Sequence, residues 1–410
     1  MSERRARTRR GAALAAALVL TLPLAAACDS TDAASGRPDG PGTTAAGAEP
    51  GATGRITPNV AGGARPVPVD TVVEVAAEGA VLDTVRLEPV GGPTQEAPAV
   101  AGRLTADGRA WRAEERLEPG VAYVLRARGE DADGNVLRRA ERFRTVDLTL
   151  DQQTYPSVAP LDGETVGVGM PVIVTFDVPV TDRASIERHL EVDARPAQPG
   201  TWHWMSDTEV HYRPKTYWKP GTEVSVDVDV NGIPAGGGIY GQVSRTVDFT
   251  VGDAHVYRVD AAAHHMKVFS NGELLRTIPV TTGKPGFTTR SGTKVIIEKF
   301  DVKRMNSETV GIAAGSAEAY DIDDVQWAMR LTYSGEFIHA APWSVGSQGY
   351  ANVSHGCTGL STADAGWLYA MSRRGDVVEY VGTDRPMTLD NGYGDWNASW
   401  ADYRAGSALG

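Results

Sequence analysis

Cysteine is almost absent from this chain of 410 residues, which contains only Cys28 and Cys357. Two thiols cannot form a disulfide framework, so each domain must be stabilised by its own apolar core. The two cysteines could form one disulfide, but the residues before Cys28 favour another fate for that side chain. Cys357 then has no partner in the chain, and an unpaired thiol in an exported protein is a candidate nucleophile.

Positive charge is also in short supply. The chain has 40 Lys and Arg against 52 Asp and Glu, and its formal net charge is −12. A surface that binds nucleic acid needs basic side chains that can neutralise phosphates. We therefore expect no nucleic-acid partner, although this charge balance says little about the substrate.

Long apolar runs are missing except near the N-terminus. Residues 1–10 are basic, and residues 11–24 form a run rich in Ala and Leu. This run has the length of a signal-peptide core and is too short to span a membrane comfortably. The small residues that follow, 25–27, stand directly before Cys28 and resemble the lipobox of bacterial lipoproteins, in which the cysteine becomes the first residue and is acylated.

We therefore predict a lipoprotein signal peptide at residues 1–27 and lipid attachment at Cys28. The lipid would anchor the protein to the outer face of the cell membrane. One alternative is a plain secretory signal that is cleaved near Ala27. Arg9 and Arg10 also hint at export by a twin-arginine route, although the residues after them match such a signal poorly.

Large apolar residues are scarce between Asp29 and Arg65, where Gly, Ala, Thr, Pro and Ser dominate. Such a segment cannot bury enough surface to offset the entropy that ordering would cost. We predict a flexible tether at residues 28–65, with a typical reach of about 30–35 Å.

Helical periodicity of useful length is absent from the first of the modules that follow. Short runs of alternating apolar and polar residues, separated by turn-forming residues, instead predict two small β-sandwiches, at 66–147 and 148–251. Residues 131–135 resemble a calcium-binding loop, but the position of their glycine favours a hairpin turn. The aromatic cluster around 202–204 could stack on sugars, although a place in the sandwich core is the simpler interpretation.

The pattern changes at residue 252, where we place a catalytic module (252–382) followed by a C-terminal tail (383–410) that we expect to pack on it. The apolar run that ends at His339 predicts a strand, and Ser361 is placed to cap a helix. Cys357 therefore lies on the loop between a strand and a helix.

The residues around Cys357 are those that acyl transfer requires. A thiol needs a base to become a thiolate, and His339 can supply one from a neighbouring strand. In an extended segment, the side chains of His355 and Cys357 lie on the same side. Gly356 lets the backbone bend, so that N–H groups beside the nucleophile can converge on an oxyanion. We predict covalent catalysis through a thioester and expect no cofactor.

Two other interpretations use the same side chains. His339, His355 and Cys357 could bind a metal ion, but no Asp or Glu lies between His339 and Cys357 to serve as a general base. The histidines could instead be core residues beside an inert cysteine, which a loop position next to glycine disfavours. We therefore expect no metal.

The motif at residues 354–357, with His339 eighteen positions before the cysteine, resembles the signature of the L,D-transpeptidases, which have a YkuD-like catalytic domain. The resemblance covers about residues 65–405. It extends to segments typical of the actinobacterial branch, at 281–285, 305–307, 326–328, 341–346 and 394–397. It implies a mainly β protein with a membrane anchor, two immunoglobulin-like β-sandwiches and a β-rich catalytic domain with a short helix after the nucleophile.

The resemblance also implies a mechanism. Cys357 would attack the carbonyl of the third residue of a peptidoglycan tetrapeptide stem, and the terminal D-alanine would leave. An amine of a neighbouring stem would then resolve the thioester into a 3→3 cross-link. His339 would be the general base, oriented by the backbone carbonyl of Ala340, and the N–H groups of His355, Gly356 and Cys357 would line the oxyanion hole. Carbapenems, which acylate the cysteine of this family, would acylate Cys357.

Substrate contacts follow from the same likeness. Met305 and Tyr320 would belong to a lid over the substrate cavity, and Trp343 would lie beside the acceptor path. Ser354 and Thr358, on either side of the His-Gly-Cys motif, would also contact the substrate.

The chain departs from the family pattern in two places. The family usually has Arg or Asn two residues after the cysteine, where this chain has Gly359, and a lid tyrosine is replaced near Val310. These changes keep two other functions open. One is a carboxypeptidase, in which water resolves the thioester, and the other is a wall-binding lipoprotein scaffold with a weak or inactive site.

Overall fold

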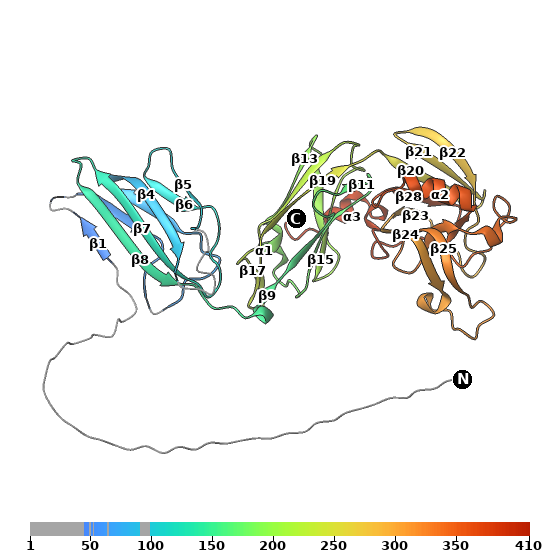
Figure 1. The fold of residues 1–410 in the computed structure, drawn as a ribbon, viewed down its shortest axis with the longest axis horizontal. Helices are drawn as coiled ribbons and strands as arrows, with labels where there is room; N and C mark the ends of the chain where they lie inside the picture. The colour runs from blue at the N-terminus through green and yellow to red at the C-terminus, as the bar shows by residue number, and fades with distance from the viewer. Residues whose placement is uncertain (1–44, 49–50, 52, 64, 91–98) are drawn as a thin grey trace, which may run out of the picture. The chain divides into compact units, whose positions relative to one another are not determined.

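The computed structural model describes residues 45–48, 51, 53–63, 65–90 and 99–410 (Figure 1). The predicted signal peptide at 1–27, the lipid-attachment residue Cys28 and much of the predicted tether lie outside these residues. None of the described helices is long and apolar enough to cross a membrane. Strands are the dominant regular structure, as the sequence predicted.

The first β-sandwich consists of two antiparallel sheets with the strand orders β1-β8-β7-β4 and β2-β3-β6-β5. Its strands are β1 (Ala45–Ala48), β2 (Arg55–Pro58), β3 (Glu74–Glu78), β4 (Ala80–Pro89), β5 (Gly102–Leu104), β6 (Ala110–Ala113), β7 (Ala122–Asp131) and β8 (Val136–Arg144). Asp131 accepts hydrogen bonds from the N–H groups of Asp133 and Asn135 at 3.0 and 2.9 Å, so this segment is the hairpin turn that we predicted.

The first sandwich begins earlier than the predicted boundary at residue 66. Strand β2 pairs with β3, and Ile56 and Val60 are buried in the core of this sandwich. Two apolar side chains in a segment rich in Gly and Ala are a weak compositional signal. Alternation along β2 nevertheless turns Ile56 inward, and the strand completes the second sheet.

The second β-sandwich contains the sheets β10-β12-β15-β14 and β11-β19-β16-β13 and a small sheet, β17-β18-β9. Its elements are η1 (Leu150–Gln152), β9 (Gln153–Thr154), β10 (Pro156–Ala159), β11 (Thr165–Val166), β12 (Val172–Phe176), α1 (Arg183–Glu187), β13 (Leu190–Arg195), β14 (Gly200–Trp204), β15 (Glu209–Pro214), β16 (Glu223–Val228), β17 (Pro234–Gly236), β18 (Ile239–Gly241) and β19 (Arg245–Val251). Trp202 and Trp204 are buried in its core, so the core interpretation of the aromatic cluster is confirmed.

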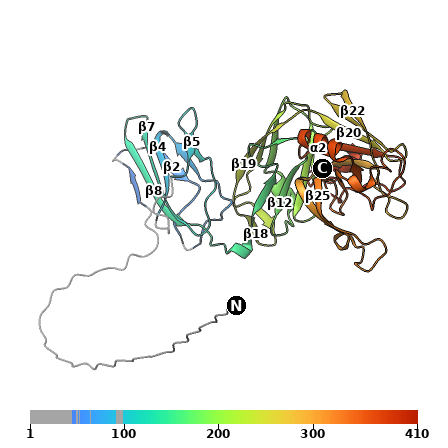
Figure 2. The ribbon, with the colours of Figure 1, turned by 45° about the vertical axis from the view of Figure 1, so that its right-hand side comes forward.

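The catalytic domain is built from a five-stranded sheet, β22-β21-β20-β28-β23, and a four-stranded sheet, β24-β25-β26-β27. Its elements are β20 (His255–Asp260), β21 (His265–Ser270), β22 (Glu273–Pro279), β23 (Gly292–Val295), β24 (Glu298–Asn306), η2 (Ser307–Val310), β25 (Asp321–Arg330), β26 (Phe337–Ala340), η3 (Pro342–Ser344), β27 (Thr358–Leu360), α2 (Thr362–Met371) and β28 (Val377–Val381). Figures 1 and 2 show the hairpin of β24 and β25 projecting from the body of this domain.

The C-terminal tail was predicted to pack on the catalytic domain, and the structure shows that it also binds the second sandwich. The tail contains η4 (Asp395–Asn397) and α3 (Trp400–Arg404). Asn397 accepts a hydrogen bond from the N–H group of Thr293 in the catalytic domain at 2.8 Å. Asp395 instead bonds His211 of β15 at 2.8 Å, and both side chains are buried. The tail therefore connects two domains.

Candidate active site

The loop that carries Cys357 is fixed at both ends by the segment after β22. The N–H group of Ser354 donates to the carbonyl of Thr282 at 3.0 Å, and the N–H group of Gly359 donates to the carbonyl of Thr281 at 2.9 Å. Between these bonds, Gly356 has φ +129°, a conformation that side-chain-bearing L-residues rarely adopt. The glycine in the motif is therefore required by the backbone geometry beside the nucleophile.

His339 lies at the same end of the sheet as Cys357. Strand β26 pairs with β27 in parallel, and this pairing places His339 opposite Gly359. The ring is buried, and its Nδ1 lies 2.7 Å from the carbonyl oxygen of Ala340, to which it donates. Burial lowers the pKa of His339, so the neutral ring carries its lone pair on Nε2. These are the properties of a general base.

A cavity of about 320 Å³ brings together most of the predicted site residues. Its lining residues are Thr281, Met305, Tyr320, Ile322, His339, Ala341, Trp343, Ser344, Val353, Ser354, His355, Cys357 and Gly359. Met305 comes from β24 and Tyr320 directly precedes β25, so both belong to the projecting hairpin. Trp343 stacks on the His339 ring with 5.8 Å between ring centroids, and 57% of its surface is exposed.

Backbone donors beside the nucleophile differ from the prediction in one respect. The N–H group of Gly356 donates to the Ser354 hydroxyl at 3.1 Å, and that hydroxyl donates to the carbonyl of Cys357 at 2.6 Å. Ser354 therefore braces the loop internally as well as lining the cavity. Within the described residues, the N–H groups of His355 and Cys357 have no hydrogen-bond acceptor. These two groups are the better candidates for an oxyanion hole.

Thr358 was predicted to contact the substrate, but the structure places it elsewhere. Its side chain is buried, and its hydroxyl lies 2.6 Å from the Tyr380 hydroxyl of β28. Side chains alternate across a strand, so a residue directly after the nucleophile at the start of β27 faces away from the cavity. Thr358 is thus a packing residue.

Gly359 replaces the Arg or Asn that we expected from the resemblance, and the structure gives a steric reason. A Cβ atom at this position would lie 2.9 Å from Cβ of Ala341 and 3.0 Å from Cγ2 of Thr281. The side chains of Ala341 and Thr281 occupy this space. The cavity wall at Gly359 is therefore closely packed although the larger side chain of the family pattern is absent.

His355 lines the same cavity as Cys357, and neighbouring side chains hold its ring. Its Nε2 lies 2.7 Å from Oε2 of Glu318, which also accepts a hydrogen bond from Nζ of Lys284 at 2.5 Å. Its ring packs against Phe287, with 4.7 Å between ring centroids. His355 therefore connects the nucleophile loop to the loop between η2 and β25.

The comparisons with known proteins agree with this geometry. The family described as L,D-transpeptidase catalytic domain matches residues 254–379, and a bacterial Ig domain matches residues 64–234. L,D-transpeptidase 2 of Mycobacterium tuberculosis (strain CDC 1551 / Oshkosh) is 37% identical over 355 residues, which cover 86% of this chain and 85% of that protein. The chain belongs to the L,D-transpeptidase family.

Two further matches each cover 55% of this chain. L,D-transpeptidase 1 of Mycobacterium tuberculosis (strain ATCC 25618 / H37Rv) is 40% identical over 226 residues, 55% of this chain and 84% of that protein. A solved structure of the LD transpeptidase LdtMt1 in complex with imipenem is 40% identical, covers 55% of this chain and 97% of that chain, and has a TM-score of 0.50. The fold predicted from the resemblance, a mainly β chain with an immunoglobulin-like part before the catalytic domain, is confirmed.

The thiol of this transpeptidase is held in its protonated form at neutral pH. Burial raises the pKa of Cys357 to about 11, and the negative charge of Glu336 acts in the same direction, whereas a backbone hydrogen bond near Phe337 and the Lys294 charge oppose it. Because thiolate is the reactive form, such a nucleophile depends on a base that removes its proton during the reaction. His339, which lines the same cavity, can accept that proton.

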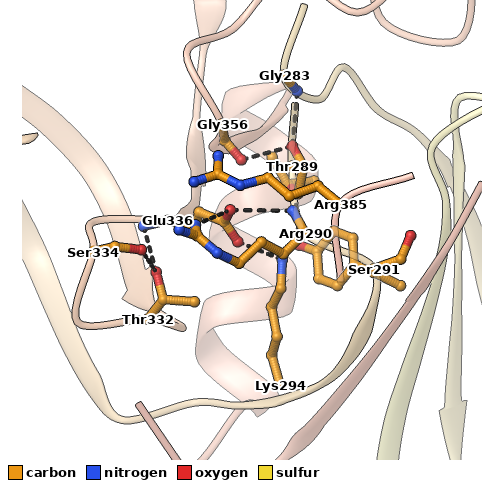
Figure 3. Close-up of polar contacts among 12 residues, drawn as sticks. Gly283, Thr289, Arg290, Ser291, Lys294, Thr332, Ser334, Glu336, Gly356 and Arg385 are labelled. Carbon is orange, nitrogen blue, oxygen red and sulfur yellow. Dashed lines mark hydrogen bonds and ion pairs between the residues drawn. The ribbon is translucent and has the colours of Figure 1, made fainter. Parts of the chain in front are cut away.

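Four charged residues at the site were missed by the sequence analysis: Lys284, Lys294, Glu318 and Glu336. Lys284 and Glu318 bind the His355 side of the loop, as described above. Lys294 and Glu336 form a buried ion pair on the other side, shown in Figure 3. One signal in the sequence could have identified Lys294. This lysine stands directly before Val295 and two isoleucines, and a charged side chain beside such an apolar run is unusual.

Proposed function

We propose that this chain is a peptidoglycan transpeptidase that forms 3→3 cross-links through a thioester on Cys357. His339 takes the thiol proton at Nε2 as the sulfur bonds to the carbonyl carbon of the third residue of a donor tetrapeptide stem. The bond to the terminal D-alanine breaks, and its amine receives the proton from His339. An amine of an acceptor stem then attacks the thioester, gives its proton to His339 and releases the thiol.

The arrangement of Cys357 and His339 on one cavity carries this proposal. The Nδ1 bond to Ala340 fixes the tautomer that a general base needs, and the N–H groups of His355 and Cys357 are available to a developing oxyanion. Relatives named L,D-transpeptidases over most of this chain support the same reaction class. Imipenem, which is bound in the solved structure of a relative, supports carbapenems as inhibitors of this chain.

Intact mass of the full chain after incubation with a carbapenem tests the nucleophile. We expect one adduct per chain in the parent and none in Cys357→Ala, because only the Cys357 sulfur can form the thioester. Cys28→Ser serves as the matched control and should keep the adduct. A parent protein that remains unmodified, or a Cys357→Ala variant that is still modified, would contradict the proposal.

Tetrapeptide stems distinguish the outcomes of the second step. Release of D-alanine with a cross-linked dimer supports the transpeptidase, whereas release with only a tripeptide identifies a carboxypeptidase, in which water resolves the thioester. Binding to peptidoglycan without D-alanine release would favour the wall-binding scaffold.

We also propose that Cys28 carries a lipid and that the protein acts at the outer face of the cell membrane. The basic residues 1–10, the apolar run 11–24 and the small residues before Cys28 support this proposal. In cells fed a labelled fatty acid, the parent should become labelled and sediment with membranes. Cys28→Ser should lose the label, and a variant that stays labelled would contradict lipid attachment at this residue.

A further inference from the structure

A buried ion pair lies directly beside the nucleophile loop and has no part in the mechanism above. Nζ of Lys294, on β23, donates to Oε2 of Glu336 at 2.5 Å, and the lysine side chain is 0% exposed. The guanidinium and the backbone N–H group of Arg290 both donate to Oε1 of Glu336, at 2.9 and 3.1 Å. Figure 3 shows the two cations on either side of this carboxylate.

The pair contacts the nucleophile loop along two routes. A Cβ atom on Gly356 would lie 3.6 Å from Cγ of Glu336, so the glycine packs on this side chain. The Cys357 sulfur lies 3.6 Å from the carbonyl oxygen of Gly335, the residue before Glu336. On the other side, Nζ of Lys294 sits 3.7 Å from the centre of the Tyr380 ring. That tyrosine bonds the hydroxyl of Thr358, which follows the nucleophile.

The segment 289–294, which contains Arg290 and Lys294, also contacts the nucleophile loop directly. The hydroxyl of Thr289 donates to the carbonyl of Gly356 at 2.8 Å and accepts from the N–H group of Gly283 at 2.8 Å. Residues 289–294 therefore supply a hydroxyl that bonds the nucleophile loop, and a guanidinium and an ammonium that bond Glu336 beside it (Figure 3).

Stability alone is a poor explanation for this arrangement. A buried ion pair must overcome the desolvation of both charges, and well-packed apolar side chains are often equally stable in its place. Charged groups buried beside a reactive side chain are characteristic of functional sites. The pair lies against Gly356 and reaches Thr358 through Tyr380, and this position points to a role in the chemistry of the thiol.

We propose that Lys294 and Glu336 are positioning residues for Cys357: their ion pair braces the nucleophile loop and, together with Arg290, places a net charge of one positive unit beside the thiol. This inference rests on the proposed function only in taking Cys357 as the nucleophile. The cations offset the Glu336 anion, which would otherwise oppose formation of a thiolate.

Lys284 and Glu318, on the His355 side of the loop, form an ion pair in which the two charges offset each other. Burial raises the pKa of Tyr320 to about 12, and it raises that of Tyr380 further. His339 is neutral because burial lowers its pKa. Burial likewise lowers the pKa of Lys294, to about 8 against the opposing effect of Glu336, so the lysine is charged at pH 7. The local charge is therefore set by Lys294, Glu336 and Arg290.

The test is the rate of Cys357 alkylation by iodoacetamide at pH 7, where Lys294 is charged. It is measured in the full chain with Cys28→Ser, so that Cys357 is the only thiol. Lys294→Met takes the local charge from one to zero, which should lower the thiolate fraction and with it the alkylation rate at pH 7 by about tenfold. Lys294→Met with Glu336→Gln restores a net charge of one, so the rate should return toward the parent value. Lys294→Arg, which keeps the charge, should stay near the parent.

Two controls keep the result interpretable. Lys267→Met makes the same chemical change at an exposed position of β21 and should leave the rate at pH 7 unchanged. Arg290→Met removes one positive charge without removing Lys294 and should also lower the rate, which provides a test if Lys294→Met does not fold. An unchanged rate in both single variants, or a double variant that is as slow as Lys294→Met, would overturn the proposal.

Alkylation needs neither substrate nor an acyl intermediate, so this experiment is separate from the test of function. A missing carbapenem adduct together with the expected changes in alkylation rate would contradict only the transpeptidase proposal. A normal adduct with unchanged alkylation rates would contradict only the role of Lys294 and Glu336.

Discussion

Replacement of His339 by asparagine should slow carbapenem acylation of Cys357 by about 10²–10⁴-fold, the usual contribution of a general base. The asparagine amide nitrogen can occupy the place of Nδ1 and keep the 2.7 Å bond to the carbonyl of Ala340. The lone pair at Nε2 is lost, so the thiol has no acceptor for its proton. The measurement is the rate of adduct formation by stopped-flow fluorescence or timed mass spectrometry.

The pH profile separates loss of the base from loss of structure. Burial lowers the pKa of His339, so the parent should retain its acylation rate down to a pH below 6.5 and lose it as the ring is protonated. His339→Asn should show no such acid limb. His265→Gln, an exposed histidine at the start of β21, is the matched control and should behave as the parent. A parental rate in His339→Asn would remove His339 from the mechanism.

The nucleophile and its base could be predicted because their chemistry is encoded within a short stretch of sequence. Cys357 is flanked by Gly356, whose φ of +129° the motif anticipates, and His339 ends an apolar run that had to be a strand. Parallel pairing of β26 and β27 then brings the two together. The predicted substrate contact of Thr358 was wrong, because strand alternation after the loop depends on where β27 begins.

The charged neighbours of the site could not be predicted in the same way. Glu336 contacts Lys294 across 42 positions of sequence, and Glu318 contacts His355 across 37. Acidic and basic residues are common on exposed loops, and apart from the apolar residues that follow Lys294, nothing local distinguishes those that become buried near the site. Packing between the two sheets decides which charges are buried.

The contacts between the C-terminal tail and the second β-sandwich could not be predicted for the same reason. The tail was predicted to pack on the catalytic domain alone. The guanidinium of Arg213, on β15, donates to the carbonyl oxygens of Asp395 and Ala398 and lies 4.2 Å from the centre of the Tyr403 ring. This contact requires a cation on a strand about 180 residues earlier, which no local pattern in the tail reveals.

Replacement of Asp395 by alanine should therefore lower the free energy of unfolding by about 3–5 kcal/mol, as expected when one partner of a buried ion pair is removed. Asp395 is fully buried, accepts from the Tyr403 hydroxyl at 2.8 Å and bonds His211 at the same distance. Without the carboxylate, the buried histidine either stays charged with only Glu209, 3.0 Å from its Nε2, as a partner, or gives up its proton. Urea unfolding of the parent and the variant measures the difference.

The pH dependence identifies the ion pair as the cause. Burial alone would lower the pKa of His211, but the charge of Asp395 and the hydrogen bonds to Asp395 and Glu209 outweigh it and raise the pKa to about 9. A histidine whose pKa is higher in the folded than in the unfolded protein stabilises the fold. Its contribution to the free energy of unfolding is complete below the unfolded pKa of about 6.5 and is lost as the pH rises through 9. The pKa of Asp395 is lowered mainly because the His211 charge outweighs burial, so its contribution is lost only in acid.

The stability difference between parent and Asp395→Ala should thus be largest between about pH 5 and 6.5 and should shrink toward pH 9.5. Asp402→Ala, an exposed acidic residue of α3, is the matched control and should change stability little at any pH. A difference that stays constant across this range would mean that Asp395 acts through packing and neutral hydrogen bonds. In that case the tail would be attached to the second sandwich mainly by Arg213 and its aromatic neighbours.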